Sequence, residues 1–314
     1  MLRLVFSLVL TFLLFSNAHA GRTVFKNGEI YEGQVNWSSR IKYDLPPGKW
    51  KLIDKYAWEW RSISGRGITL MQEENGKVTQ FYEIGEFDTN GKYIAYLNSW
   101  LQEIMFKGKH DGCYERPEYN IVIRRKKGAS FNCFKVRHFD LDKRLYSPDT
   151  HWQEMNMAGI KHYFKKNPNL QLPKIMLASV HDFYNLTVTG KALYLTHLIV
   201  PEHFGGPKSK FKTEDSSEYH RTRIESYPKH QKFMEDFLSS AAYHHSKFEN
   251  SVKAKKKHKL DLSQIKMKEF KNTNKTLSGN DSDITSQILA LTELYKSGAL
   301  SKAEFDKAMK KILN

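Results

Sequence analysis

Alternating apolar and polar positions run through the first part of the chain and predict strands. In residues 49–60, KWKLIDKYAWEW, five large apolar side chains lie at even positions, namely Trp50, Leu52, Tyr56, Trp58 and Trp60. Side chains two residues apart in a strand share one face of the sheet. We therefore expect this segment to form a strand that presents all five of these side chains on the same side.

Turn signals divide the same region into hairpins. Asn-Gly dipeptides occur at residues 27–28, 75–76 and 90–91, and each suits a tight turn that needs positive φ. Residues 120–124 and 131–136 are rich in β-formers and flank the segment KKGAS. This pattern predicts a hairpin.

Helical periodicity enters after residue 147. Residues 151–166 carry apolar side chains at helical spacing, and Asn167-Pro168 ends the pattern. Residues 229–247 predict a second amphipathic helix. Apolar runs at 174–180 and 192–200 predict strands, and the polar residues 202–217 predict a long loop.

Together these patterns predict an α+β fold. A strand-rich part spans residues 21–146, and a mixed α+β part spans residues 147–262. The pattern leaves open whether the two parts form one domain or two.

Composition supports a folded protein with a basic surface. The chain has 314 residues, of which 40% are hydrophobic and 13% aromatic, enough to build a packed core. Fifty Lys and Arg residues against 34 Asp and Glu give a formal net charge of +16. The two cysteines are too few for a disulfide-rich scaffold or a multi-cysteine zinc fold.

The first twenty residues have the pattern of a secretory signal peptide. A positive start at Arg3 precedes the apolar run LVFSLVLTFLLF, and Ala18-His19-Ala20 places small residues at −3 and −1 before Gly21. The apolar run is shorter than the roughly 20 residues that span a bilayer. We expect cleavage between Ala20 and Gly21 and a soluble mature protein that is periplasmic or secreted.

Export changes the interpretation of Cys113 and Cys133. An oxidising compartment favours a disulfide between them. The loop that it closes would contribute about 3 kcal/mol. The alternative is a catalytic or metal-bound thiol, but the pair has no C-x-x-C redox spacing. We expect the disulfide.

The chain becomes strongly basic and then polar beyond the body. Eight lysines lie between Lys253 and Lys271, against Asp261 and Glu269. Such a segment binds polyanions or an anionic envelope surface, or is a solvated face that leads into a linker. Residues 263–283 predict a flexible basic and polar linker, because NTNKTLSGNDSD has little apolar content.

Residues 284–314 predict a helical hairpin. Leu291, Leu294 and Tyr295 lie in its first helix, Gly298 suits the C-cap, and Ser301 with Glu304 forms a capping box for the second helix. The set Leu294-Tyr295, Gly298, Leu300, Ser301, Glu304-Phe305, Lys310-Lys311 and Leu313 resembles the SHOCT domain, a short C-terminal helical hairpin found mainly in bacterial proteins. Ala299-Leu300 departs from the Ile that usually follows the glycine in that family. The resemblance implies self-association or contact with another protein, and no catalytic residues. The alternative is a hairpin docked on its own body.

No catalytic motif stands out in the body. His181, Asp182, His197 and His203 are the candidate metal ligands, but the chain has no H-E-x-x-H motif and no G-x-S-x-G motif. Packed structural histidines are the competing interpretation.

The sequence therefore favours an exported, non-catalytic binding or interaction protein, with no cofactor and no nucleic-acid partner. A metal-assisted hydrolase that uses the four candidate side chains is the first alternative. A binder of polyanions at the envelope surface is the second.

Overall fold

The computed structural model describes residues 24–39, 41–60, 63–88, 121–127, 130–146, 151–185, 192–211, 213, 215–269, 301–302, 305–307 and 310. The predicted signal peptide, Cys113 and most of the predicted C-terminal hairpin lie outside these ranges. The chain divides into two compact units, Met1–Lys271 and Asn272–Asn314.

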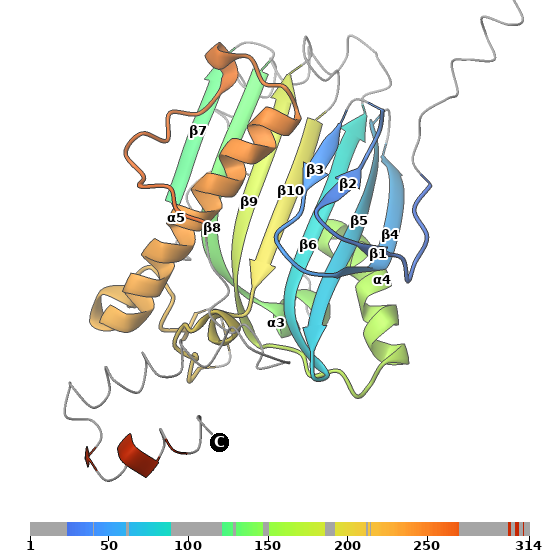
Figure 1. The fold of residues 1–314 in the computed structure, drawn as a ribbon. Helices are drawn as coiled ribbons and strands as arrows, with labels where there is room; N and C mark the ends of the chain where they lie inside the picture. The colour runs from blue at the N-terminus through green and yellow to red at the C-terminus, as the bar shows by residue number, and fades with distance from the viewer. Residues whose placement is uncertain are drawn as a thin grey trace, which may run out of the picture. The chain divides into compact units, whose positions relative to one another are not determined.

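An antiparallel sheet of eight strands forms the first unit (Figure 1), which confirms the mixed α+β class. The spatial order is β1-β4-β5-β6-β10-β9-β8-β7. The bounds are Ile30–Tyr31 for β1, Trp50–Trp60 for β4, Ile63–Glu74 for β5, Lys77–Asp88 for β6, Ile121–Lys127 for β7, Ser130–Asp140 for β8, Ile175–Asn185 for β9 and Ala192–Ile199 for β10. Strands β2 (Gln34–Asn36) and β3 (Lys42–Asp44) form a separate two-stranded sheet. Because β6 pairs with β10, a single sheet runs through both of the parts that the sequence distinguishes.

Local turn chemistry sets several of these pairings. Asn75 and Gly76 connect β5 to β6 with φ values of 51° and 72°, as a two-residue hairpin turn requires. Strands β7 and β8 pair as the predicted hairpin. Strand β9 is longer than the predicted residues 174–180, and its extension to Asn185 pairs with β10.

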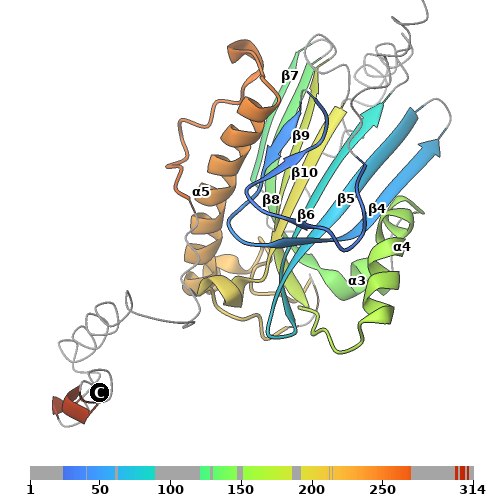
Figure 2. The same cartoon turned by 45° about the vertical axis from the view of Figure 1, so that its right-hand side comes forward.

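Helices cover both faces of the sheet. Helix α5 (Pro228–Ser251) packs Phe233, Phe237 and Ala241 against β8 and β9, as its apolar stripe predicts. Helices α3 (Leu141–Tyr146) and α4 (His151–Lys166) cover the opposite face. Figure 2 shows the sheet between these two helical layers. The β2–β3 hairpin shares the α5 face, where the rings of Tyr43 and Phe248 stack with centroids 6.0 Å apart.

A bulge in β4 corrects the prediction for its even-numbered side chains. The register shifts between Leu52 and Asp54, so that one residue of β4 has no partner of its own in β5. Beyond the bulge, even-numbered side chains point to the face of the sheet opposite to the one they occupy before it. Trp50 and Leu52 therefore lie in the core beneath α5, whereas Tyr56 lies on the other face and donates a hydrogen bond to Glu83.

Residues 252–269 form an extended segment, here called the strap, that runs back beside α5. Its apolar side chains Val252, Ala254, Leu260 and Leu262 are buried, and the Lys268 N–H donates to the Ser239 carbonyl oxygen at 3.4 Å. A short 3₁₀ helix, η4 (Lys256–His258), lies within it. The first seven residues of the predicted linker 263–283 therefore belong to the body.

The second unit is described at a few positions near its end. The Phe305 N–H donates to the Ser301 carbonyl oxygen at 3.0 Å, the first intrahelical bond expected when Ser301 is the N-cap. None of the helices in the described ranges combines the length and apolar composition that a membrane span needs.

Candidate functional site

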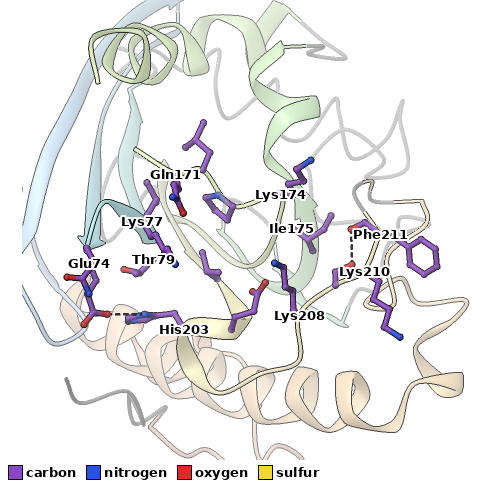
Figure 3. Close-up of a pocket in the computed structure, with 17 residues that line it drawn as sticks. Glu74, Lys77, Thr79, Gln171, Lys174, Ile175, His203, Lys208, Lys210 and Phe211 are labelled. Atoms are coloured by element: carbon purple, nitrogen blue, oxygen red, sulfur yellow. Dashed lines mark hydrogen bonds and ion pairs between the residues drawn. The ribbon is translucent and has the colours of Figure 1, made fainter. Parts of the chain in front are cut away.

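A cavity of about 970 Å³ opens at one end of the sheet, beside the turn between β5 and β6 (Figure 3). Three segments that are distant in sequence form it: residues 74–79, 171–175 and 200–211. Its lining consists of Glu74, Asn75, Lys77, Val78, Thr79, Gln171, Leu172, Pro173, Lys174, Ile175, Val200, Glu202, His203, Lys208, Ser209, Lys210 and Phe211.

Backbone hydrogen bonds fix the first wall. The Val78 N–H donates to the Gln171 carbonyl oxygen at 3.1 Å, and the Gln171 N–H donates to the Gly76 carbonyl oxygen at 2.8 Å. The Val200 N–H donates to the Thr79 carbonyl oxygen at 3.0 Å. These bonds hold the three lining segments together without using the lysine side chains.

A carboxylate holds the loop that forms the second wall. Glu218 accepts hydrogen bonds from the Ser209 hydroxyl at 2.6 Å and from the Lys210 N–H at 3.0 Å. The Tyr219 hydroxyl donates to the Pro207 carbonyl oxygen at 2.6 Å. Burial favours the neutral carboxyl of Glu218, but these hydrogen bonds outweigh it and lower the pKa of this residue. The ionised carboxylate of Glu218 therefore holds the loop at residues 209–210 in place.

The side chains around the cavity carry an excess of positive charge. Four lysines, Lys77, Lys174, Lys208 and Lys210, are opposed by the carboxylates of Glu74 and Glu202. In the view of Figure 3, Lys77 and Lys208 come from opposite sides of the cavity, and Lys210 points away from it.

His203 adds no charge to this set near neutral pH. Its Nδ1 lies 3.4 Å from Glu74 Oε2, and burial lowers the pKa of the imidazole despite that carboxylate. Burial also raises the pKa of Glu202, an effect that the nearby Lys208 opposes. The cavity thus remains positive around pH 7.

Apolar side chains form the rest of the wall. They are Val78, Leu172, Pro173, Ile175, Val200 and Phe211. Phe211 is 42% exposed, a high value for a phenylalanine. Apolar walls with a few placed charges, at a volume of 300 to 1,000 Å³, are typical of small-molecule sites.

The four histidine and aspartate candidates from the sequence do not share one site. His181 and His197 lie on neighbouring strands β9 and β10 and both face α5, where each is buried. Asp182 follows His181 in β9, so it points to the opposite face of the sheet. His203 is at the cavity. Within the described ranges, no three His, Cys, Asp or Glu side chains gather as metal ligands.

His181 belongs instead to a buried network of polar side chains beneath α5. Its Nε2 lies 3.1 Å from Ser179 Oγ, and its Nδ1 lies 2.9 Å from Nδ1 of His245. Nε2 of His245 lies 3.4 Å from Glu249, which also accepts hydrogen bonds from the Asn132 amide and the Leu260 N–H. Because the two Nδ1 atoms are in hydrogen-bond contact, only one of them can carry a hydrogen. This network joins β8, β9, α5 and the strap.

His197 is also a structural histidine in this fold. Its Nε2 lies 2.8 Å from Gln80 Oε1, and its ring meets those of Trp50, Tyr82 and His244 edge-on. Burial lowers the pKa of both His181 and His197 well below the usual value. Cys133 is fully buried on β8, and its predicted disulfide stays a prediction because Cys113 lies outside the described residues.

Sequence reasoning identified one residue of the cavity, His203, and missed the lysines. The glycine-rich segment Gly205-Gly206-Pro207-Lys208-Ser209 is the one signal that the sequence offers near the lysines. Its Pro207 excludes a P-loop, but Lys208 and Ser209 do line the cavity.

Comparisons of the chain with protein-family models, with curated proteins and with solved structures find no match. The resemblance of residues 284–314 to the SHOCT domain therefore rests on the sequence alone.

Proposed function

We propose that this chain is an exported binding protein whose cavity takes a small amphiphilic anion, a molecule with an apolar body and a carboxylate, sulfonate or phosphate group. One observation carries the proposal: three lysines, Lys77, Lys174 and Lys208, border an apolar-walled cavity of about 970 Å³. Export rests on the signal peptide predicted at residues 1–20.

The hydroxyl groups of the cavity support binding rather than nucleophilic catalysis. The Ser209 hydroxyl donates to Glu218, whose lowered pKa makes it a poor general base. The Thr79 hydroxyl donates to the Gln72 carbonyl oxygen at 3.2 Å. Both groups therefore hold the backbone of the cavity in place.

Titration with 8-anilinonaphthalene-1-sulfonate, followed by the fluorescence of this amphiphilic anion, tests the proposal. The cavity variant Lys77→Gln/Lys208→Gln removes two charges from exposed side chains that lie outside the folded core. The control variant Lys165→Gln/Lys166→Gln removes two exposed charges from the end of α4, and neither lysine lines the cavity.

We expect saturable binding to the unchanged protein, at least tenfold weaker binding to the cavity variant and an affinity within twofold for the control. Near-UV circular dichroism checks that all three proteins are folded. Equal affinities for the two variants would argue against the cavity as the binding site.

We also propose that the C-terminal hairpin, residues 284–314, provides a protein contact, either self-association or a partner. The support is its resemblance to the SHOCT domain and the apolar stripes that the sequence predicts on two short helices. Helices of about a dozen residues are marginal in water and gain stability from a partner surface.

A further inference from the structure

The strap presents lysines to solvent from a fixed scaffold. Its buried residues Val252 and Ala254 pack in the core near α5, and Leu260 and Leu262 pack against β8 and the helix. Six of its lysines are exposed: Lys253, Lys255, Lys256, Lys257, Lys266 and Lys268. The strap is thus an ordered, one-sided structure.

Buried hydrogen bonds fix the part that carries the densest charge. The Asn132 amide donates to the His258 carbonyl oxygen at 3.0 Å, and the Leu260 N–H donates to Glu249 at 2.7 Å. The Ala254 N–H donates to the Glu249 carbonyl oxygen at 2.9 Å. The lysines between these anchors are therefore held together on the surface in spite of their mutual repulsion.

In the part of the chain that the structure describes, no carboxylate pairs with the lysines next to the end of α5. Among the described residues, none forms an ion pair with Lys253, Lys255, Lys256 or Lys257. The end of α5 favours cations, but the helix dipole acts only within the last turn. It accounts for a lysine at position 253 and not for the run at 255–257.

Lys253 has a further peculiarity. It follows the helix with φ of 53°, in the left-handed region that favours glycine. A charged side chain thus occupies a position where glycine would be the least strained residue.

We propose that the strap docks on a membrane surface rich in anionic lipid. An exposed apolar residue favours a lipid surface over a soluble polyanion: Met267 is 46% exposed and lies between Lys266 and Lys268. Basic side chains with an intervening apolar side chain suit the boundary between headgroups and acyl chains. The inference is independent of the ligand proposed for the cavity.

Co-sedimentation with lipid vesicles tests it, using phosphatidylcholine alone and phosphatidylcholine with 30% phosphatidylglycerol, at 50 and 500 mM NaCl. The strap variant is Lys255→Gln/Lys256→Gln/Lys257→Gln. The control variant, Lys42→Gln/Lys165→Gln/Lys166→Gln, makes the same change in net charge on exposed residues elsewhere.

We expect the unchanged protein to bind the anionic vesicles at low salt and to be released at high salt. Each lysine near such a surface contributes about fivefold, so the strap variant should bind about 100-fold more weakly. The control should stay within threefold, and all three proteins should bind anilinonaphthalene sulfonate alike.

Three results would overturn the proposal. The first is equal binding to vesicles with and without phosphatidylglycerol, or no binding to either. The second is the same loss in both variants, which would indicate a response to net charge alone. The third is tighter binding to heparin than to anionic vesicles, which would assign the strap to a soluble polyanion.

Discussion

Buried imidazoles on the α5 side of the sheet make the stability of the protein depend on pH. His181 and His197 are packed among aromatic rings, and burial lowers the pKa of each. In the unfolded chain both titrate near pH 6.5. As the pH falls below that value the unfolded state gains protons that the folded state does not bind, so stability falls with pH.

The variant His197→Gln tests this at one residue, because an amide can still donate to Gln80. Between pH 7.5 and 5.5 a histidine that stays neutral in the folded state costs about 1.4 kcal/mol of unfolding free energy. We expect the loss of stability over this range to be smaller in the variant by about that amount. Denaturant unfolding at the two pH values measures it.

Burial raises the pKa of carboxyls such as Asp54, and these groups make the protein more stable as the pH falls. Their contribution is the same in both proteins, so it cancels when the variant is compared with the unchanged protein. Identical pH dependence in the two proteins would show that His197 titrates normally in the folded state.

For single residues, the sequence could show that some candidate metal ligands lie apart, but it could not show which residues they contact. Adjacent residues in a strand point to opposite faces, so His181 and Asp182 had to diverge once β9 reached them. The apolar run ends at Val180, so the sequence predicts a strand that stops before both residues. The contact between His181 and His245 joins a strand to a helix 64 residues away, and no local pattern encodes it.

Among the elements, strands β4, β5, β6 and β10 are neighbours in the sheet, and one row of paired residues across them consists of two tyrosines and two glycines. Gly67 pairs with Tyr56 and with Gly85, and Gly85 pairs with Tyr194. The hydroxyls of Tyr56 and Tyr194 are hydrogen-bonded to each other, and Tyr56 also donates to Glu83 at 2.5 Å. A Cβ at Gly85 would overlap the Tyr194 ring.

The variant Gly85→Ala should therefore lower the free energy of unfolding by about 2 to 3 kcal/mol, as overpacking does. In a Tyr194→Leu background, which lacks the outer ring atoms, the same change should cost less than about 1 kcal/mol. Denaturant unfolding of the four proteins completes the cycle. If Gly85→Ala lowers the free energy of unfolding equally in both backgrounds, the added methyl group does not clash with the Tyr194 ring.

Element types were predictable where the pattern is local. The Asn75-Gly76 turn, helix α4 and the apolar stripe of α5 follow from turn chemistry and periodicity. The bulge at residue 53 does not, because β5 determines it across the sheet. The sequence places the end of the body at residue 262, because polar and basic residues dominate beyond it. The strap nevertheless continues to residue 269, and the Lys268 N–H donates to the Ser239 carbonyl oxygen.

The two compact units give a prediction for the whole molecule. If residues 284–314 self-associate, deleting them should leave the first unit folded and lower the number of chains per particle in solution. Light scattering on the chain with and without these residues measures this number, with circular dichroism as the check on folding.

A pull-down with the two chains covers the case of a different partner. An unchanged number of chains per particle together with an unchanged set of captured proteins would contradict the role proposed for the hairpin.

The cavity itself could not be predicted from the sequence. Its lysines lie at positions 77, 174 and 208, about 100 and 34 residues apart, on segments whose meeting depends on the order of the strands in the sheet. Each lysine alone is an ordinary surface residue. Only the assembled sheet places them around one apolar wall.

Titration calorimetry with two ligands of equal chain length and opposite charge tests the central claim most directly. The account predicts that decanoate binds with a 1:1 stoichiometry and at least tenfold more tightly than decyltrimethylammonium, because lysines outnumber carboxylates at the cavity. The preference should shrink as salt screens these charges, and it should be lost in Lys77→Gln/Lys208→Gln. Equal or tighter binding of the cation to the unchanged protein would contradict the account.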